Sequence, residues 1–324
     1  MSPFLITLLT IAIVVGVVFW VALRRFKTVS PEPPSGNDPD STTTTTTTVD
    51  LKKKYAELND KLVAILSENY KNIELIAEGG MGVIAKAYDM ERQRGVAIKT
   101  ILPELQQDTH VIELFLQECQ VIQAMNHPNV VRIFEVGQSE NLYYYIMDFL
   151  EGENLDDLME RKKVLTTEQV LKIGTHVARA LQHIHSSGLI HRDIKPSNIF
   201  ITKDNVAKIV DFGVAKLLNA KVKYHYSSVG SPLYASPEQI RGEEVTGKSD
   251  IYSFGVCLFY MLSGQHPFST ADLIAKMFET PKNLRSLNKD VPDSLASIIH
   301  YCLNVDPKGR LPAHELWARL RAIR

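Results

Sequence analysis

The chain has 324 residues, 45% hydrophobic and 23% charged, which excludes a mainly disordered or fibrous protein and leaves enough apolar side chains for a sizeable core. Lysine and arginine total 36 against 37 aspartates and glutamates, so the net charge is -1. Non-specific nucleic-acid binders normally show a basic excess, and we therefore expect no nucleic-acid partner. The three cysteines have no C-x-x-C spacing, which argues against a disulfide framework and a cysteine zinc site.

The first segment, Phe4–Leu23, contains only uncharged and mostly apolar residues. A helix of this length spans about 30 Å, the thickness of the hydrocarbon core of a bilayer. The basic residues Arg24, Arg25 and Lys27 follow this run instead of preceding it, so the positive-inside rule places residues 1–3 outside the cell. We expect a single-pass anchor in the cell membrane, with the lipid bilayer as partner and the rest of the chain cytoplasmic. A cleaved signal peptide or a buried core helix is the alternative.

Two further segments precede the main domain. Residues 24–49 combine several prolines with a run of threonines at 42–48 and should form a flexible, solvated linker. Residues 50–69 predict an amphipathic helix, because apolar residues recur at spacings of four and three. This stripe consists of Leu51, Tyr55, Leu58, Leu62 and Ile65. Packing on the following domain is favoured over self-pairing through 51–66, and the lysines at 52–54 are interpreted as a solvated face.

From Tyr70 the pattern changes to short β-rich runs and then to helices. The expected strands are 73–77, 83–88, 95–101, 130–136 and 142–149, with a helix over 110–125 before the fourth strand. After Leu155 the sequence is mostly helical, for example over 167–185 and 248–262. A small sheet lobe followed by a larger helical lobe predicts a cleft between them, where a ligand can bind.

Glycines at 79, 80 and 82 lie between the first two strands. A backbone without Cβ atoms can approach phosphates closely and offer its N–H groups. This is neither a Walker A loop nor a dinucleotide fingerprint, because no Gly-Lys-Ser/Thr follows and a strand follows instead of a helix. Downstream, Lys99 ends an apolar strand, and Glu118 on the predicted helix is a candidate partner that would orient the lysine.

The chemistry-bearing residues are concentrated in two later motifs. His-Arg-Asp-Ile-Lys-Pro-Ser-Asn occupies 191–198, and Asp-Phe-Gly begins at Asp211. Asp193 can accept a hydroxyl proton, and Lys195 can neutralise charge on a moving phosphoryl group. Asn198 and Asp211 offer hard oxygens suited to Mg²⁺. Alignment and charge neutralisation are what phosphoryl transfer requires.

Residues 70–324 resemble a protein kinase catalytic domain, close to the bacterial Hanks-type (eukaryotic-like) serine/threonine kinases. The resemblance implies an α+β bilobal kinase fold, here preceded by one transmembrane helix. The small five-stranded β lobe with one main helix would be 70–150, and the large, mostly helical lobe 151–324. The resemblance also implies ATP and Mg²⁺ as cofactors, serines and threonines of proteins as substrates, and a role in signal transduction. We also consider a homodimer, through the kinase lobe or through 51–66.

The resemblance assigns a role to each matching residue. Lys99 would anchor ATP and pair with Glu118. Asp193 would be the base, and Lys195 would bridge to the γ-phosphate. Asn198 and Asp211 would bind magnesium. The other residues implied to bind the nucleotide are Ile76, Ala77, Glu78, Gly79, Gly80, Met81, Gly82, Val83, Ile84, Ala97, Met147, Asp148, Leu150 and Phe200.

Two structural expectations also follow from the resemblance. Glu238, in the Ser-Pro-Glu that ends the activation segment, should pair with Arg310. Asp250 should brace the backbone of the catalytic loop.

Departures from the family pattern give a rival interpretation. Ala77 stands where the first loop glycine is usual, which predicts a weaker ATP affinity. The rival is therefore a pseudokinase, a membrane-tethered scaffold that binds nucleotide without catalysis. Autophosphorylation of the activation loop is expected at Ser227 or Ser228, and Ser231 is the third serine of this loop.

Overall fold

The computed structural model describes residues 51, 53–79, 82–123, 125–139, 142–211, 233–268 and 279–323. The chain divides into two units, 1–45 and 46–324, and every described residue belongs to the second. The predicted membrane anchor at 4–23 and the linker at 24–49 lie outside the described residues. Within the described part of the chain, no helix has both the length and the apolar character that a bilayer span requires.

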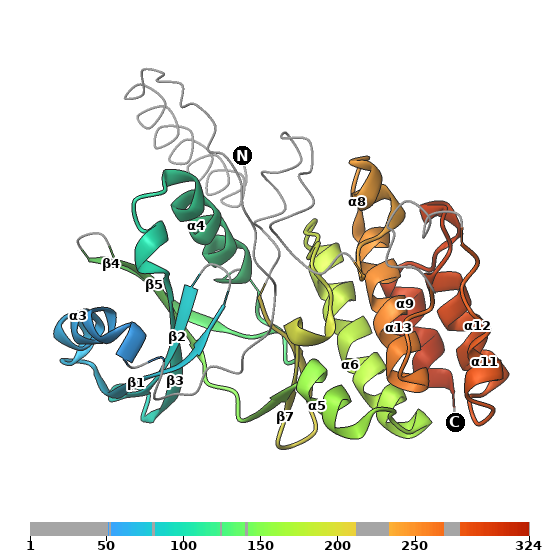
Figure 1. The fold of residues 1–324 in the computed structure, drawn as a ribbon, viewed down its shortest axis with the longest axis horizontal. Helices are drawn as coiled ribbons and strands as arrows, with labels where there is room; N and C mark the ends of the chain where they lie inside the picture. The colour runs from blue at the N-terminus through green and yellow to red at the C-terminus, as the bar shows by residue number, and fades with distance from the viewer. Residues whose placement is uncertain are drawn as a thin grey trace, which may run out of the picture. The chain divides into compact units, whose positions relative to one another are not determined.

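The first lobe is built on a five-stranded antiparallel sheet with the order β1-β2-β3-β5-β4 (Figure 1). Its strands are β1 (Tyr70–Glu78), β2 (Gly82–Asp89), β3 (Arg94–Ile101), β4 (Ile133–Ser139) and β5 (Leu142–Asp148). A short 3-10 helix (Pro103–Leu105) and the helix α4 (Thr109–Gln123) connect β3 to β4. The predicted small lobe of five strands and one main helix is therefore confirmed.

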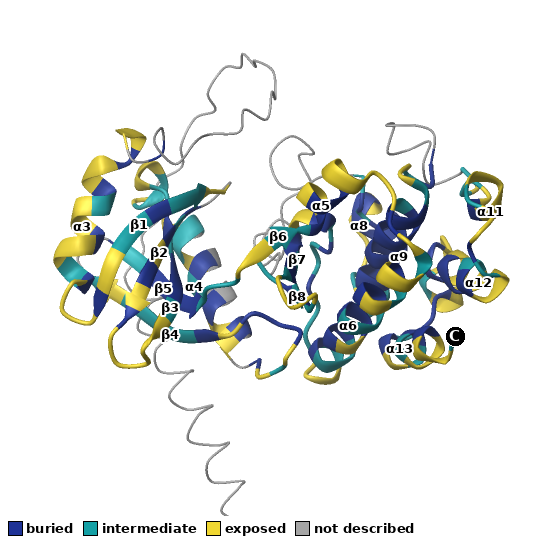
Figure 2. Cartoon of the chain, turned by 90° about the horizontal axis from the view of Figure 1, so that it is seen from below, coloured by how far each residue is buried: buried dark blue, intermediate teal, exposed yellow. Residues whose placement is uncertain are grey.

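This sheet separates two hydrophobic cores, because successive residues of a strand point to opposite faces. On β3, Val96 and Ile98 belong to one core, and Ala97 and Ile101 belong to the other. The helix α3 (Ala56–Leu66) covers the first face, whereas the second core continues into α4 and the larger lobe (Figures 1 and 2).

The apolar stripe predicted over 51–66 is buried against the first face of the sheet. Leu58 and Leu62 are 3% and 0% exposed, and Leu51 and Tyr55 are also buried. The expected packing of this helix on the following domain is therefore confirmed. A homodimer through the same stripe would require α3 to leave the sheet.

One strand prediction is wrong at its start. The apolar run Val130–Val136 predicts a strand over its whole length, but β4 begins only at Ile133. Val130 forms an isolated parallel bridge to Ile209, and the amide of Val131 donates to the Ile209 carbonyl at 2.9 Å. These residues are apolar because they are buried between the two lobes, and burial alone does not imply pairing within the sheet.

The second lobe is mostly helical and is centred on α9 (Gly247–Ser263), which is buried along most of its length. The neighbouring helices are α5 (Leu155–Lys162), α6 (Thr167–Ser186), α8 (Pro237–Arg241), α11 (Leu284–Leu287), α12 (Asp293–Cys302) and α13 (Ala313–Ala322). A small antiparallel sheet combines β6 (Gly152–Asn154), β7 (Ile199–Thr202) and β8 (Ala207–Ile209). The loop between α6 and β7 carries the predicted catalytic motif.

Candidate active site

The backbone of the catalytic loop is held by one buried carboxylate. The amides of His191 and Arg192 donate to Oδ2 and Oδ1 of Asp250, at 2.9 and 2.8 Å. Asp250 lies in the first turn of α9 and is 1% exposed. The predicted bracing of the loop by Asp250 is confirmed. The sequence did not indicate a third partner, His185 on α6, whose Nε2 lies 2.8 Å from Asp250 Oδ2.

The Asp250 carboxyl keeps its negative charge although it is buried. Burial by itself would raise the pKa of this carboxyl, but the contact with His185 and the backbone amides lower the pKa below its ordinary value. Asp250 is therefore ionised at neutral pH. Burial also lowers the pKa of His191, which keeps that imidazole neutral beside the loop.

We expect Asp250→Asn to destabilise the protein, because one acceptor for the loop amides becomes an NH₂ donor. The free energy of unfolding should fall by about 1–3 kcal/mol, the cost of leaving a buried donor unsatisfied. Denaturant unfolding measures this change. Asp204→Asn, at an exposed turn between β7 and β8, is the matched control and should have little effect. Equal losses in the two variants would contradict the bracing role.

Two side chains of the loop converge on one carboxylate oxygen. Lys195 Nζ lies 3.0 Å from Asp193 Oδ2, and the side-chain amide of Asn198 donates to the same oxygen at 3.1 Å. Asn198 also donates to the Asp193 carbonyl at 2.9 Å, which ties the two ends of the loop together. The Asp193 side chain is 15% exposed, so the carboxylate is oriented yet reachable from solvent.

A second ion pair connects the two lobes. Lys99 Nζ on β3 lies 2.9 Å from Asp211 Oδ1, just after β8. The amide of Val210 donates to the Asn198 carbonyl at 3.0 Å, so Asp211 is attached to the catalytic loop. Glu118, the predicted partner of Lys99, lies on α4, but its side chain is outside the described residues.

The glycine loop joins β1 to β2 as a tight hairpin. The amide of Gly79 donates to the Gly82 carbonyl at 2.8 Å. A Cβ at Gly82 would lie 2.4 Å from the backbone oxygen of Thr100, so any side chain there would displace β2 from β3. Gly80 and Met81, two of the residues expected to bind nucleotide, lie outside the described residues.

The two faces of this hairpin differ. Ala77 pairs with Ile84, and Ile84 packs against the core that contains Ala97. Glu78 pairs with Val83, and Val83 belongs to the core under α3. The hairpin therefore presents Ala77 and Ile84 on the Lys99 face, whereas the side chains of Glu78 and Val83 lie on the α3 face.

The remaining residues expected to bind the nucleotide come from both lobes. Ala97 and Met147 are partners in the β3–β5 register and share one core, and Leu150 packs against it. The Asp148 carboxylate accepts a 2.6 Å hydrogen bond from Arg94. The other two positions are half-buried, Ile76 on β1 and Phe200 on β7.

A buried ion pair stabilises the larger lobe away from the reacting groups. Arg310 donates to both carboxylate oxygens of Glu238, at 2.6 and 2.8 Å, and both side chains are almost fully buried. The predicted Glu238–Arg310 pair is confirmed. Burial would raise the pKa of Glu238, but the hydrogen bonds from Arg310 and Ser249 lower it below the ordinary value.

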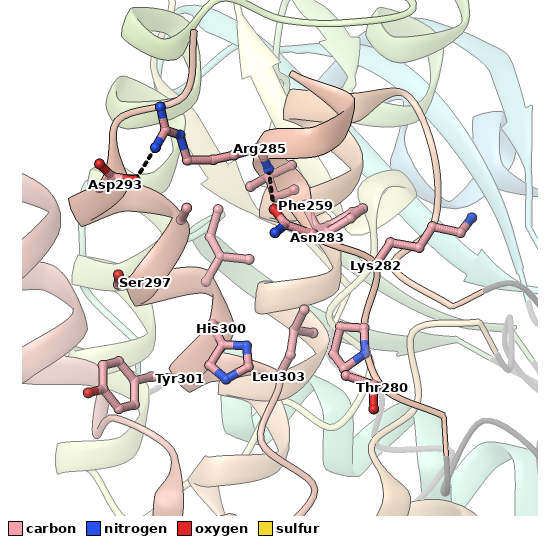
Figure 3. Close-up of a pocket in the computed structure, with 14 residues that line it drawn as sticks. Phe259, Thr280, Lys282, Asn283, Arg285, Asp293, Ser297, His300, Tyr301 and Leu303 are labelled. Atoms are coloured by element: carbon pink, nitrogen blue, oxygen red, sulfur yellow. Dashed lines mark hydrogen bonds and ion pairs between the residues drawn. The ribbon is translucent and has the colours of Figure 1, made fainter. Parts of the chain in front are cut away.

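The larger lobe also contains a hollow of about 510 Å³ beside α11 and α12 (Figure 3). Polar side chains such as Lys282, Asn283 and His300 line it, together with the apolar Phe259 and Leu303. Its lining contains none of the side chains predicted for catalysis.

The bilobal fold and the cluster of lysines, carboxylates and amide between the lobes define a protein kinase catalytic domain. The family model described as "Protein kinase domain" matches residues 70–319, and the chain belongs to this family. The family implies the use of ATP and a divalent metal ion. Within the part of the chain that the structure describes, no group of three or more histidine, cysteine or acidic side chains is placed to hold a metal.

Three similar proteins are also described as kinases or kinase domains. The chain is 36% identical to the serine/threonine-protein kinase PrkC of Bacillus subtilis, over 77% of this chain and 39% of PrkC. It is 32% identical to the serine/threonine-protein kinase PknB of Mycolicibacterium smegmatis, over 79% of this chain and 42% of PknB. The chain thus spans about two fifths of the length of these curated relatives. The PknI kinase domain of Mycobacterium tuberculosis shares the fold, with a TM-score of 0.62 at 22% identity, over 78% of this chain and 96% of that one.

Proposed function

We propose that this protein is an ATP-dependent serine/threonine protein kinase. The observation that carries the proposal is the convergence of Lys195 and Asn198 on the Asp193 carboxylate, next to the Lys99–Asp211 pair. This arrangement offers a base, two cations and two oxygen ligands within one connected set of contacts. Phosphoryl transfer requires these groups because its catalysis depends on positioning and charge neutralisation.

Each group has a distinct role in the proposed reaction. The substrate hydroxyl gives its proton to Asp193 while its oxygen bonds to the γ-phosphorus and the bond from that phosphorus to ADP breaks. Lys195 neutralises charge on the transferred group, and Lys99 holds phosphate oxygens of ATP. The glycine hairpin offers its backbone N–H groups to the same phosphates. The serine/threonine preference rests on the Asp-Ile-Lys-Pro-Ser-Asn loop at 193–198.

The donor set suits Mg²⁺. The Asn198 NH₂ group donates to Asp193, which leaves the amide oxygen as its cation ligand. Asp211 supplies carboxylate oxygens, and hard oxygen ligands of this kind are those that Mg²⁺ prefers. A bound Mg²⁺ ion would neutralise charge on the phosphates.

Labelled ATP tests the function directly. The full chain is incubated with γ-labelled ATP, Mg²⁺ and a generic basic protein, and the product is hydrolysed in acid. The proposal expects labelled phosphoserine or phosphothreonine, and no label when the divalent ion is removed. Phosphotyrosine as the main product would overturn the substrate class.

A nucleotide-binding scaffold is the second candidate, and Ala77 is the feature that favours it. The extra methyl lies on the face of the hairpin that carries Lys99. Clear ATP binding by the chain without any label transfer would establish the scaffold. Ala77→Gly would then test whether the methyl is responsible.

Autophosphorylation is proposed for the activation segment, whose serines Ser227, Ser228 and Ser231 lie outside the described residues. Arg192 directly precedes Asp193, and a basic group there favours an incoming phosphate. Phosphopeptide mapping after incubation with ATP should find phosphate on Ser227 or Ser228. A bare segment in fully active protein would contradict this prediction.

Anchoring by Phe4–Leu23 is proposed from the sequence, with the kinase domain on the cytoplasmic side. Alkaline washing of cell membranes tests it, because a spanning helix stays in the pellet whereas peripheral proteins are released.

A further inference from the structure

The two residues that directly precede α3 lie beside the start of the glycine loop. The Nζ of Lys54 and the hydroxyl of Tyr55 both donate to Glu78 Oε1, each at 2.7 Å. Glu78 is the last residue of β1 and directly precedes Gly79, whose amide closes the hairpin on the Gly82 carbonyl. A segment that precedes the catalytic sheet in the sequence therefore holds the residue at which the loop begins.

This contact does not compete with a nucleotide. The Glu78 side chain lies on the α3 face of the sheet, because its strand partner Val83 belongs to the core under α3. Ala77 and its partner Ile84 lie on the opposite face, which carries Lys99. The Glu78 carboxylate can therefore be bound on the α3 face of the sheet while the opposite face remains available to phosphates.

The two donors, Tyr55 and Lys54, differ in how far they are buried. Tyr55 is 4% exposed, and its ring is packed in the core beside Leu58, so core packing sets the position of its hydroxyl. Lys54 is about half exposed and adds a positive charge from the solvent side. The hydrogen bonds from Lys54 and Tyr55 lower the pKa of Glu78, so the carboxylate is ionised at neutral pH.

We propose that Tyr55 and Lys54 are positioning residues for nucleotide binding, which act through Glu78 on the glycine loop. The inference rests on the proposed kinase function and names a further part of the same site. A binding segment loses conformational entropy when it becomes ordered around a ligand, and this loss is smaller where the residue that begins the segment is already held, as Glu78 is here. Releasing the loop should therefore weaken ATP binding and leave the chemical step unchanged.

The test compares three variants of the full chain. Tyr55→Phe removes only the hydroxyl and keeps the ring in the core, and Lys54→Met removes the charge. Tyr55→Phe should raise the KM and the Kd for Mg-ATP about threefold to tenfold. Lys54→Met should raise both constants by no more than about fivefold, because its ion pair is exposed. In both variants kcat should stay within about twofold of the unchanged chain. Lys53→Met, at an exposed neighbouring lysine, is the matched control and should leave both constants unchanged.

Coupling to Glu78 separates positioning from a general structural role. In a Glu78→Ala background, Tyr55→Phe should cause no further rise in KM or Kd, because the hydroxyl has already lost its acceptor. Thermal melting of every variant confirms that it is folded. An unchanged Kd in Tyr55→Phe, or the same rise with and without Glu78, would overturn the proposal. If the unchanged chain transfers no phosphate, the proposed function fails, and the Kd for ATP still decides this inference.

Discussion

Replacing Asp193 with alanine is expected to lower kcat for phosphate transfer about 10²-fold to 10⁴-fold, the range that a positioned general base contributes. The variant loses the group that accepts the substrate proton, and Lys195 and Asn198 lose the oxygen on which both converge. A steady-state assay with labelled Mg-ATP and a basic protein substrate measures the change. The Lys195 side chain is 21% exposed, so water can replace its lost partner and the fold should survive.

The affinity for nucleotide provides the control for this variant. ATP contacts are expected from Lys99 and the glycine hairpin, so the Kd for Mg-ATP should stay within about threefold of the unchanged chain. A variant that binds ATP normally and has lost transfer confirms Asp193 as the base. Transfer at an undiminished rate would refute that role and would also favour the scaffold over the kinase.

The largest effect on stability is expected from Arg310→Met. The guanidinium binds both oxygens of Glu238 and also donates to the backbone carbonyls of Lys248, Asn304 and Val305. Removing it leaves a buried carboxylate without its cation, so the free energy of unfolding should fall by about 3–5 kcal/mol. Denaturant unfolding monitored by circular dichroism measures the loss.

An exposed pair on α13 supplies the matched control. Arg319 contacts Glu315 one helical turn away, and their side chains are 45% and 39% exposed. Arg319→Ala should therefore cost no more than about 1 kcal/mol. A loss of similar size in the two variants would show that the burial of Arg310 is not what makes its pair important.

Low pH should weaken the contribution of the buried Glu238–Arg310 pair to stability. The pKa of Glu238 is lowered in the folded state, so its contribution to stability is complete above its ordinary value of 4.5 and is lost as the pH falls through the folded-state pKa. The stability difference between the unchanged chain and Glu238→Gln should therefore shrink as the pH falls below 4.5. A difference that is constant down to pH 3 would contradict this assignment.

Much of the catalytic domain was predictable because its motifs are local. The residues from Asp193 to Asn198 lie within one loop, so their proximity follows from the sequence itself. Two stabilising contacts were predictable for another reason. Asp250, which binds the loop backbone, and the Glu238–Arg310 pair occupy positions that the family resemblance specifies. The structure confirms both contacts.

One interpretation was wrong and another was incomplete, because a local pattern does not show the tertiary contacts of a residue. Val130 and Val131 are apolar like strand residues, yet their partner is Ile209 in the other lobe. Lys54 lies on the exposed face that was predicted for its basic run, and its ammonium group also binds Glu78, a contact that the sequence did not indicate. The local sequence around a single residue does not indicate which distant residue will contact it.

The sequence by itself determined the family, the order of the two lobes and the composition of the catalytic loop. Only the tertiary structure decided which distant groups meet: Lys99 with Asp211 across the two lobes, and Tyr55 with Glu78 behind the glycine loop. The physical reason is that periodicity shows which face of a helix or strand is apolar but does not show what covers it. Ion pairs and hydrogen bonds between distant residues depend on that packing, because they require contact within a few ångströms.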